Sequence, residues 1–164
     1  MRIKNNRSFC GINSCPASID SQNNTEILTN RYFTSRWRKI QRTDKKSYRT
    51  YCLIGDGETQ EGQIWEAALC AGNYKLSNLC VFLDANKFQI DGATKDVMDL
   101  EPLPEKFKAF KWNVLEIDGH DMDQILSALK KAKEEKEKPT MIIAHTIKGK
   151  GVSFMEGDNQ WHGK

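Results

Sequence analysis

The sequence contains no apolar run that approaches the ~20 residues of a membrane-spanning helix, and it is 38% hydrophobic and 29% charged over 164 residues. It also lacks a stretch with the charged head, apolar centre and small-residue cleavage site of a secretory signal. Its five cysteines are an odd number and show no CxxC spacing, which argues against a disulfide framework or a metal site. We therefore expect one folded domain with a real core and no membrane association.

The cysteines also bear on the compartment. Cys52, Cys70 and Cys80 lie within apolar segments. In such segments a buried, reduced and inert thiol is the usual state of cysteine. The sequence thus predicts a reducing, cytoplasmic environment.

Charge is unevenly distributed along the chain. Residues 1–46 carry a net charge of +7, and the remaining 118 carry −4. A basic N-terminal arm can indicate nucleic-acid binding. Residues 31–42, however, show no regular periodicity and no nucleic-acid motif, so no nucleic-acid partner is predicted. The preceding segment, residues 10–30, is rich in Ser, Asn and Thr without periodicity and is expected to be loop or disorder.

The most informative stretch runs from Gly55 to Gly92. An apolar run, residues 51–54, ends at Gly55-Asp56-Gly57, and a second, residues 79–83, ends shortly before Asn86. A helical pattern separates them, so the stretch reads as a strand–helix–strand unit with both strand ends at one edge of a parallel sheet. Because ligands of open α/β sheets bind at that edge, we expect Asp56 and Asn86 to be neighbours in one site.

The residue types at this edge point to a cation and a phosphate. Mg²⁺ in proteins usually takes one or two carboxylates together with phosphate oxygens and water. Gly57 would let backbone N–H groups approach a phosphate closely. The structural alternative is an ordinary Asp-Gly turn after a strand.

The rest of the chain continues the α/β alternation. Residues 112–117 and 140–145 read as further strands, Thr59 and Asp121 as helix caps, and residues 105–110 as a short helix. The predicted fold is a three-layer α/β domain, a parallel sheet with helices on both faces. A basic glycine-rich loop, residues 146–152, follows the last strand, and Lys148 in it could meet a diphosphate or simply be solvated.

Taken together, Gly-Asp-Gly at 55–57, Asn86 thirty residues after Asp56, the Lys-Gly-Lys-Gly loop at 148–151 and Trp-His-Gly-Lys at 161–164 resemble the transketolase family of thiamine-diphosphate enzymes. The resemblance runs from residue 44 to 164 and is greatest to short, N-terminal-half transketolases that work with a separate second subunit. It implies transfer of a two-carbon ketol unit between sugar phosphates, with thiamine diphosphate and Mg²⁺ as cofactors.

The resemblance also implies roles for particular residues. Asp56, Asn86 and the carbonyl oxygen of Phe88 would hold Mg²⁺. Lys148 and His162 would contact the cofactor, and His162 would also help proton transfer, for which imidazole is suited. The remaining cofactor contacts would come from Gly57, Asn86 and Ile90. Ile90 would pack on the thiazolium ring, unless it is an ordinary core isoleucine.

Assembly follows from the same resemblance. Glu61 and Glu66 match dimer-interface positions, with a solvated helix face as the alternative. The glutamate that activates the aminopyrimidine would come from a partner subunit carrying the pyrimidine-binding domain, so a dimer or heterotetramer is expected and the chain alone should be inactive. Residues 44–164 would form the cofactor-binding domain, incomplete relative to the family.

The first 43 residues do not share the resemblance. No histidine precedes His120, and a single glycine, Gly11, precedes Gly55, whereas the family carries histidines and a glycine-rich turn in this region. We hypothesise that residues 1–41 are not native fold-forming sequence, as a shifted frame, a truncated gene or a chimaeric gene would produce. Other interpretations are a non-catalytic transketolase fragment, another thiamine-diphosphate transferase such as a deoxyxylulose-phosphate synthase, and a basic-arm nucleic-acid binder.

Overall fold

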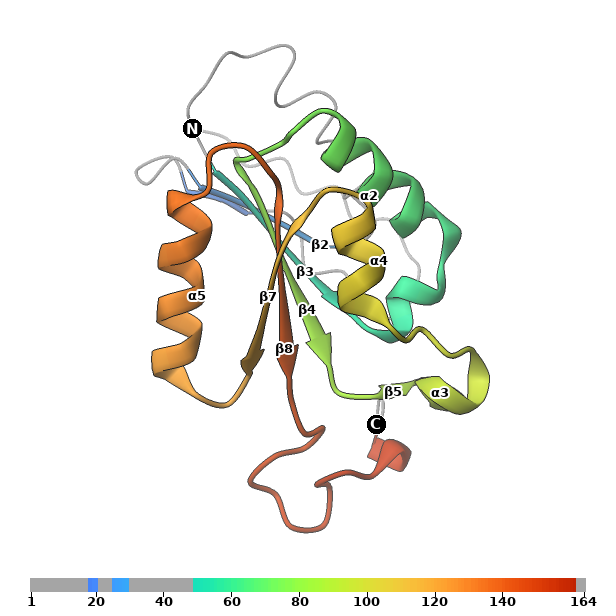
Figure 1. Cartoon of the computed structure of the whole chain (residues 1–164). Coiled ribbons are helices and arrows are strands. Elements are labelled where there is room, and N and C mark those ends of the chain that lie inside the picture. The colour runs from blue at the N-terminus through green and yellow to red at the C-terminus, as the bar shows by residue number, and fades with distance from the viewer. Residues whose placement is uncertain (1–17, 21–24, 30–48, 162–164) are drawn as a thin grey trace, which may run out of the picture.

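The computed structural model describes residues 18–20, 25–29 and 49–161 (Figure 1). Within them, a six-stranded sheet has the order β1-β2-β3-β4-β8-β7. Neighbouring strands from β2 to β7 run parallel, and β1 at the edge pairs antiparallel with β2. The strands are β1 (Ser18–Asp20), β2 (Thr25–Thr29), β3 (Arg49–Gly55), β4 (Leu79–Ala85), β7 (Asn113–Asp118) and β8 (Thr140–His145).

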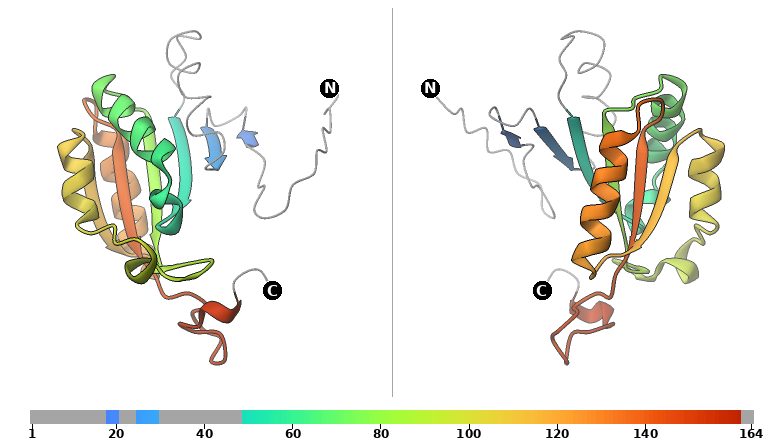
Figure 2. Two further views of the ribbon diagram at one scale, coloured as in Figure 1. Left: turned by 90° about the vertical axis from the view of Figure 1, so that its right-hand side faces the viewer. Right: turned by 60° about the vertical axis from the view of Figure 1, so that its left-hand side comes forward.

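Helices cover both faces of this sheet. α2 (Gly62–Asn73) and α4 (Leu103–Ala109) lie on one face and α5 (Met122–Glu134) on the other, as the two views of Figure 2 show. The smaller elements are η1 (Gly57–Gln60), α3 (Thr94–Val97), η2 (Asn159–Trp161) and the two-stranded ribbon of β5 (Phe88–Gln89) and β6 (Gly92–Ala93). The three-layer α/β prediction is confirmed, with β1 as an antiparallel exception.

Alternate residues of the central strands fill two separate cores. In β8, Met141 and Ile143 pack in the core with residues of α2 and α4, whereas Ile142 and Ala144 pack in the core with residues of α5. The side chains of a strand alternate between faces. A central parallel strand is therefore apolar at almost every position, which is why β8 was recognisable in the sequence.

Two buried thiols belong to these cores. Cys52 lies in the core beneath α2 and α4, and Cys80 lies in the core beneath α5. Burial raises the pKa of each thiol to about 12. Both are free and stay protonated at neutral pH, as expected for inert core cysteines; Cys70, also free, is half-buried.

Local predictions about helix ends met different outcomes. The Asp121 cap is confirmed, since its carboxylate accepts the N–H groups of Asp123 and Gln124. The Thr59 cap is wrong: Thr59 lies inside η1, where its hydroxyl donates to the Asp56 carbonyl at 2.6 Å. Asp56 takes the capping role there because its own carboxylate accepts the N–H of Gly57.

The segment expected to be loop or disorder contains two strands. β1 and β2 lie within residues 10–30, and β2 pairs with β3 from Thr25↔Arg49 to Thr29↔Leu53. The remainder of residues 1–48 lies outside the described residues, and the hypothesis that residues 1–41 are not native stays a prediction. Within the described part of the chain, no helix has the length and apolar character that a membrane crossing requires.

Candidate functional site

The carboxyl ends of three parallel strands meet at one edge of the sheet. In the strand register, Gly55 of β3 pairs with Asp84 of β4, and Ala85 of β4 pairs with His145 of β8. The residues that follow these pairs are Asp56, Asn86 and Thr146. The loop that follows the outer strand β7 adds His120 to the same edge.

Asp56 is held firmly at this edge. It is only 4% exposed, and its two carboxylate oxygens accept different backbone N–H groups, that of Gly57 at 2.8 Å and that of Lys87 at 2.6 Å. Burial raises the pKa of the Asp56 carboxyl above its usual range; the two N–H bonds oppose this shift, and the charge of Asp84 adds to it. A nearby cation would stabilise the ionised form of such a buried carboxylate.

The Asn86 side chain bonds within the turn that follows β4. Its side-chain oxygen accepts the N–H of Phe88 at 2.9 Å, and its side-chain nitrogen donates to the Asp84 carboxylate at 2.8 Å. Lys87, between Asn86 and Phe88, adopts a left-handed backbone conformation with φ of 68°. The structure thus brings the Asp56 carboxylate and the Asn86 amide oxygen onto successive N–H groups of one turn.

Gly57 allows the β5 backbone to pass close to the Asp56–Gly57 turn. A Cβ on Gly57 would stand 2.5 Å from the Gln89 Cβ and 3.7 Å from the Phe88 carbonyl oxygen. The Phe88 carbonyl therefore lies beside the Asp56–Gly57 turn, as a third oxygen at the same edge. Ile90, one residue beyond, is 61% exposed, so the structure does not place it in the core.

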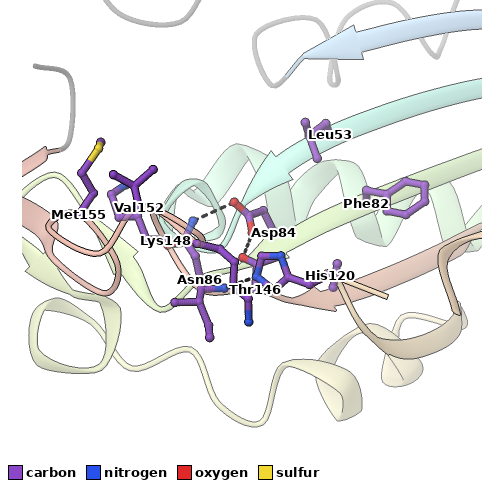
Figure 3. Close-up of a pocket in the computed structure, with 13 residues that line it drawn as sticks. Leu53, Phe82, Asp84, Asn86, His120, Thr146, Lys148, Val152 and Met155 are labelled. Carbon is purple, nitrogen blue, oxygen red and sulfur yellow. Dashed lines mark hydrogen bonds between the residues drawn. The ribbon is translucent and has the colours of Figure 1, made fainter. Parts of the chain in front are cut away.

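The loop that follows β8, residues 146–157, contains Lys148 and is called the Lys148 loop. It folds back on itself. The N–H of Gly157 donates to the Lys148 carbonyl at 2.8 Å, which closes the loop. Gly149 adopts φ of 71°, and a Cβ there would stand 2.6 Å from the Met155 carbonyl oxygen, so glycine is needed at this position. The loop forms one wall of a pocket of about 680 Å³ whose other walls include Asp84, Asn86 and the apolar Leu53 and Phe82 (Figure 3).

Several residues of this pocket were not predicted as site residues, among them Asp84, His120 and Thr146. Thr146 donates its hydroxyl to the Asp84 carboxylate, and the N–H of Ile147 donates to His120 Nε2 at 2.8 Å (Figure 3). Asp84 stands two positions before Asn86, hence on the same side of the strand, and this spacing could have indicated it. The link between His120 and Ile147 joins two loops 27 residues apart and leaves no local sequence signal.

The other predicted residues lie elsewhere. Glu61 and Glu66 are exposed at the start of α2, on the surface of the described chain. Their interface role stays a prediction. His162 lies outside the described residues, which end in this region at Trp161. The Trp161 indole N–H donates to the Phe154 carbonyl at 3.0 Å, and the two rings lie 5.3 Å apart.

The donor set at this edge fits a hard cation beside a phosphate. In the described part of the chain no three His, Cys, Asp or Glu side chains come together as a metal cluster. The candidate ligands are one carboxylate, one amide oxygen and one carbonyl, which suit Mg²⁺ when phosphate oxygens and water complete its shell. Gln89, whose Cα and Cβ lie close to Gly57, has a buried side-chain nitrogen without a hydrogen-bond partner in the described chain.

Known proteins are similar to this chain in sequence and in fold. The family described as "Transketolase, thiamine diphosphate binding domain" matches residues 21–164, beginning upstream of the predicted boundary at residue 44. The 6-deoxy-6-sulfo-D-fructose transketolase subunit SqwG of Clostridium sp. is 56% identical over 107 residues, 65% of this chain and 39% of that protein. An apulose-4-phosphate transketolase subunit of Phocaeicola vulgatus is 47% identical over 119 residues, 73% of this chain and 42% of that protein.

A solved structure agrees. The crystal structure of transketolase from Campylobacter jejuni superposes with a TM-score of 0.69 at 37% identity, over 78% of this chain and 20% of that one. The chain therefore spans about two fifths of the length of the two bacterial relatives and a fifth of the Campylobacter enzyme.

Proposed function

The chain belongs to the transketolase family, within its thiamine diphosphate binding domain, and from this premise we propose that it is the cofactor-binding part of a split transketolase. The proposed reaction transfers a two-carbon ketol unit between sugar phosphates. Two relatives that are named as transketolase subunits support the proposal, because they match most of this chain.

We assign the cation to the place where the Asp56–Gly57 turn after β3 meets the turn between β4 and β5. Asp56, Asn86 and the Phe88 carbonyl would hold Mg²⁺. The single observation that carries the assignment is the convergence of the Asp56 carboxylate and the Asn86 amide oxygen on the consecutive N–H groups of Lys87 and Phe88. This arrangement fixes two oxygen ligands that come from the ends of different strands, because the Asp56 bond to Lys87 spans 31 residues of the chain.

The thiamine diphosphate would lie beside the cation. Bound thiamine diphosphate supplies a nucleophilic carbon that attacks a ketose and an electron sink for the resulting carbanion. In this proposal Gly57 admits the diphosphate to the backbone, and Lys148 and His162 bind it. Ile90, which is exposed at the site edge, would pack against the thiazolium ring.

A partner is part of the proposal. The partner would be a second transketolase chain with a pyrimidine-binding domain, whose glutamate would activate the aminopyrimidine. Exposed Glu61 and Glu66 on α2 would face it. We expect no turnover by the isolated chain and turnover when such a partner is added, and full activity of the chain alone would contradict this part of the proposal.

Calorimetric titration with thiamine diphosphate tests the cofactor assignment. With Mg²⁺ present, the chain should bind thiamine diphosphate, and binding should disappear without a divalent cation or in Asp56→Ala. Asp123→Ala, which removes an exposed carboxylate on α5, should bind as the wild type does. Equal binding by Asp56→Ala and the wild type would refute the assignment.

A non-catalytic fragment of such an enzyme is the second candidate. Such a fragment would fold without completing the site. The same titration separates the two, since a fragment with an incomplete site should show no cation-dependent binding of thiamine diphosphate.

A further inference from the structure

Asp84 stands where the three segments of the site meet. It is the penultimate residue of β4, and the register places it between Gly55 of β3 and Ala144 of β8. Its side chain is half-buried and lines the pocket (Figure 3). None of the proposed ligands or cofactor contacts includes it.

Each polar group of Asp84 bonds a different part of the site. Its carbonyl oxygen accepts the N–H of Asp56 at 3.1 Å. One carboxylate oxygen accepts the Asn86 side-chain N–H at 2.8 Å, and the other accepts the Thr146 hydroxyl. One residue therefore contacts the cation side of the site and the start of the Lys148 loop.

The bond to Asn86 determines which end of that amide faces the cation. A carboxylate can only accept hydrogen bonds, so the Asn86 nitrogen must point toward Asp84. The Asn86 oxygen is then directed to the opposite side, where it accepts the Phe88 N–H and keeps a lone pair for a metal ion. Without the Asp84 carboxylate, the bond from the Phe88 N–H would be the only one of these two left to hold the amide in this orientation.

The bond to Thr146 acts on the phosphate side. Thr146 is the first residue after β8 and lies two positions before Lys148. Its N–H also reaches the Ala85 carbonyl, at 3.5 Å, so the N–H and the hydroxyl of Thr146 both attach the start of the loop to β4. The position of the Lys148 loop therefore depends on the same carboxylate that orients Asn86.

We propose that Asp84 is a positioning residue, which orients the Asn86 oxygen toward the cation and ties the Lys148 loop to the same point. The inference rests on the proposed function of Asp56 and Asn86. Asp84 acts through Asn86 and Thr146 and does not itself bind the ion. Partners of this kind, which orient metal ligands, typically change metal affinity about 10- to 100-fold when they are replaced.

Two variants test the orientation. Asp84→Asn keeps the shape but introduces a donor, so the Asn86 amide loses one of the two bonds that fix its direction. We expect the Mg²⁺ concentration that half-saturates thiamine diphosphate binding, measured by calorimetry, to rise about 10- to 100-fold. The exchanged variant Asp84→Asn/Asn86→Asp restores a donor–acceptor pair and places a carboxylate with oxygens on both sides at position 86. It should recover most of the lost affinity.

Nuclear magnetic resonance of the chain without cofactor gives a second readout. The Asn86 side-chain N–H₂ signals should show slowed solvent exchange in the wild type and in Thr146→Val, and fast exchange in Asp84→Asn. Thr146→Val leaves the Asn86 bond in place and should loosen only the loop. An unchanged urea midpoint for each variant would show that the fold is intact.

The outcomes separate this inference from the proposed function. If the wild type does not bind thiamine diphosphate with Mg²⁺, both fail. If the wild type binds but Asp84→Asn needs no more Mg²⁺, or the exchanged variant stays as weak as Asp84→Asn, only the role of Asp84 is overturned.

Discussion

The carboxylate of Asp56 accepts the backbone N–H of Lys87 at 2.6 Å, across 31 residues of sequence. This bond joins the end of β3 to the turn after β4, and Asp56 is only 4% exposed there. Because Asn86 bonds the next N–H along that turn, the two side chains are fixed relative to one another before any ion arrives. Such preorganisation lowers the cost of binding.

The pH dependence of stability should report the burial of Asp56. Its pKa is raised chiefly by burial, so the folded chain takes up a proton at higher pH than the unfolded chain, whose value is about 3.9. The sign follows: as pH rises through the folded pKa, the wild type loses stability that Asp56→Asn does not lose. In urea unfolding, the free energy of unfolding of the wild type should fall relative to that of Asp56→Asn as the pH rises. A difference that grows in favour of the wild type would contradict the shift.

Gly57→Ala should damage the site and the fold together. The new Cβ would stand 2.5 Å from the Gln89 Cβ, so β5 must move. We expect a loss of about 1–3 kcal/mol in the free energy of unfolding and weaker binding of Mg²⁺ with thiamine diphosphate. Gly62→Ala is the matched control, because a Cβ there meets nothing within 4 Å. It should be neutral or stabilise by up to about 1 kcal/mol as a better helix former. Equal stability of the two variants would refute the prediction.

His120→Ala should release the start of the Lys148 loop. The imidazole accepts the Ile147 N–H at 2.8 Å, so removing the ring leaves that amide to solvent. Hydrogen exchange at Ile147 should become faster, while exchange in the middle of β8 should not change. His145→Ala is the comparison, since His145 is exposed and its ring contacts Glu116 at 3.2 Å instead. Faster exchange at Ile147 in both variants, or in neither, would count against the tether.

The buried thiols should resist modification in the folded chain. Cys52 and Cys80 have pKa values raised to about 12, so the reactive thiolate is scarce at pH 8. Half-buried Cys70 should react with a disulfide reagent before either of them does. Mass spectrometry of the labelled peptides would identify the order, and early labelling of Cys52 or Cys80 would contradict this packing. Addition of urea should make all three react.

Much of the fold was predictable because its central strands are apolar runs. β8, with five consecutive buried residues from Thr140 to Ala144, shows this most clearly. Parallel register then predicted that Asp56 and Asn86 share one edge. β1 and β2 were not predicted, because strands of three and five residues with polar composition depend on pairing with a neighbour, β1 with β2 and β2 with β3, rather than on their own pattern.

The site was predictable only as far as local spacing reaches. Asp84 and Thr146 meet because β4 and β8 are neighbours in the sheet, although they are 62 residues apart in sequence. The expected helix cap at Thr59 was wrong for a similar reason, since Asp56 already occupies that role and also bonds the distant Lys87. Side chains that connect separate strands need the register of the sheet before their partners can be named.

Paramagnetic broadening by Mn²⁺ tests the central claim most directly. In the presence of thiamine diphosphate, substoichiometric Mn²⁺ should broaden the backbone amide signals of Gly57, Lys87 and Phe88 before any others, because those groups surround the proposed ligands. The same experiment with Asp56→Ala should leave these signals sharp. Broadening that begins at another surface, or that is the same in the variant, would contradict a single cation site built from Asp56 and Asn86.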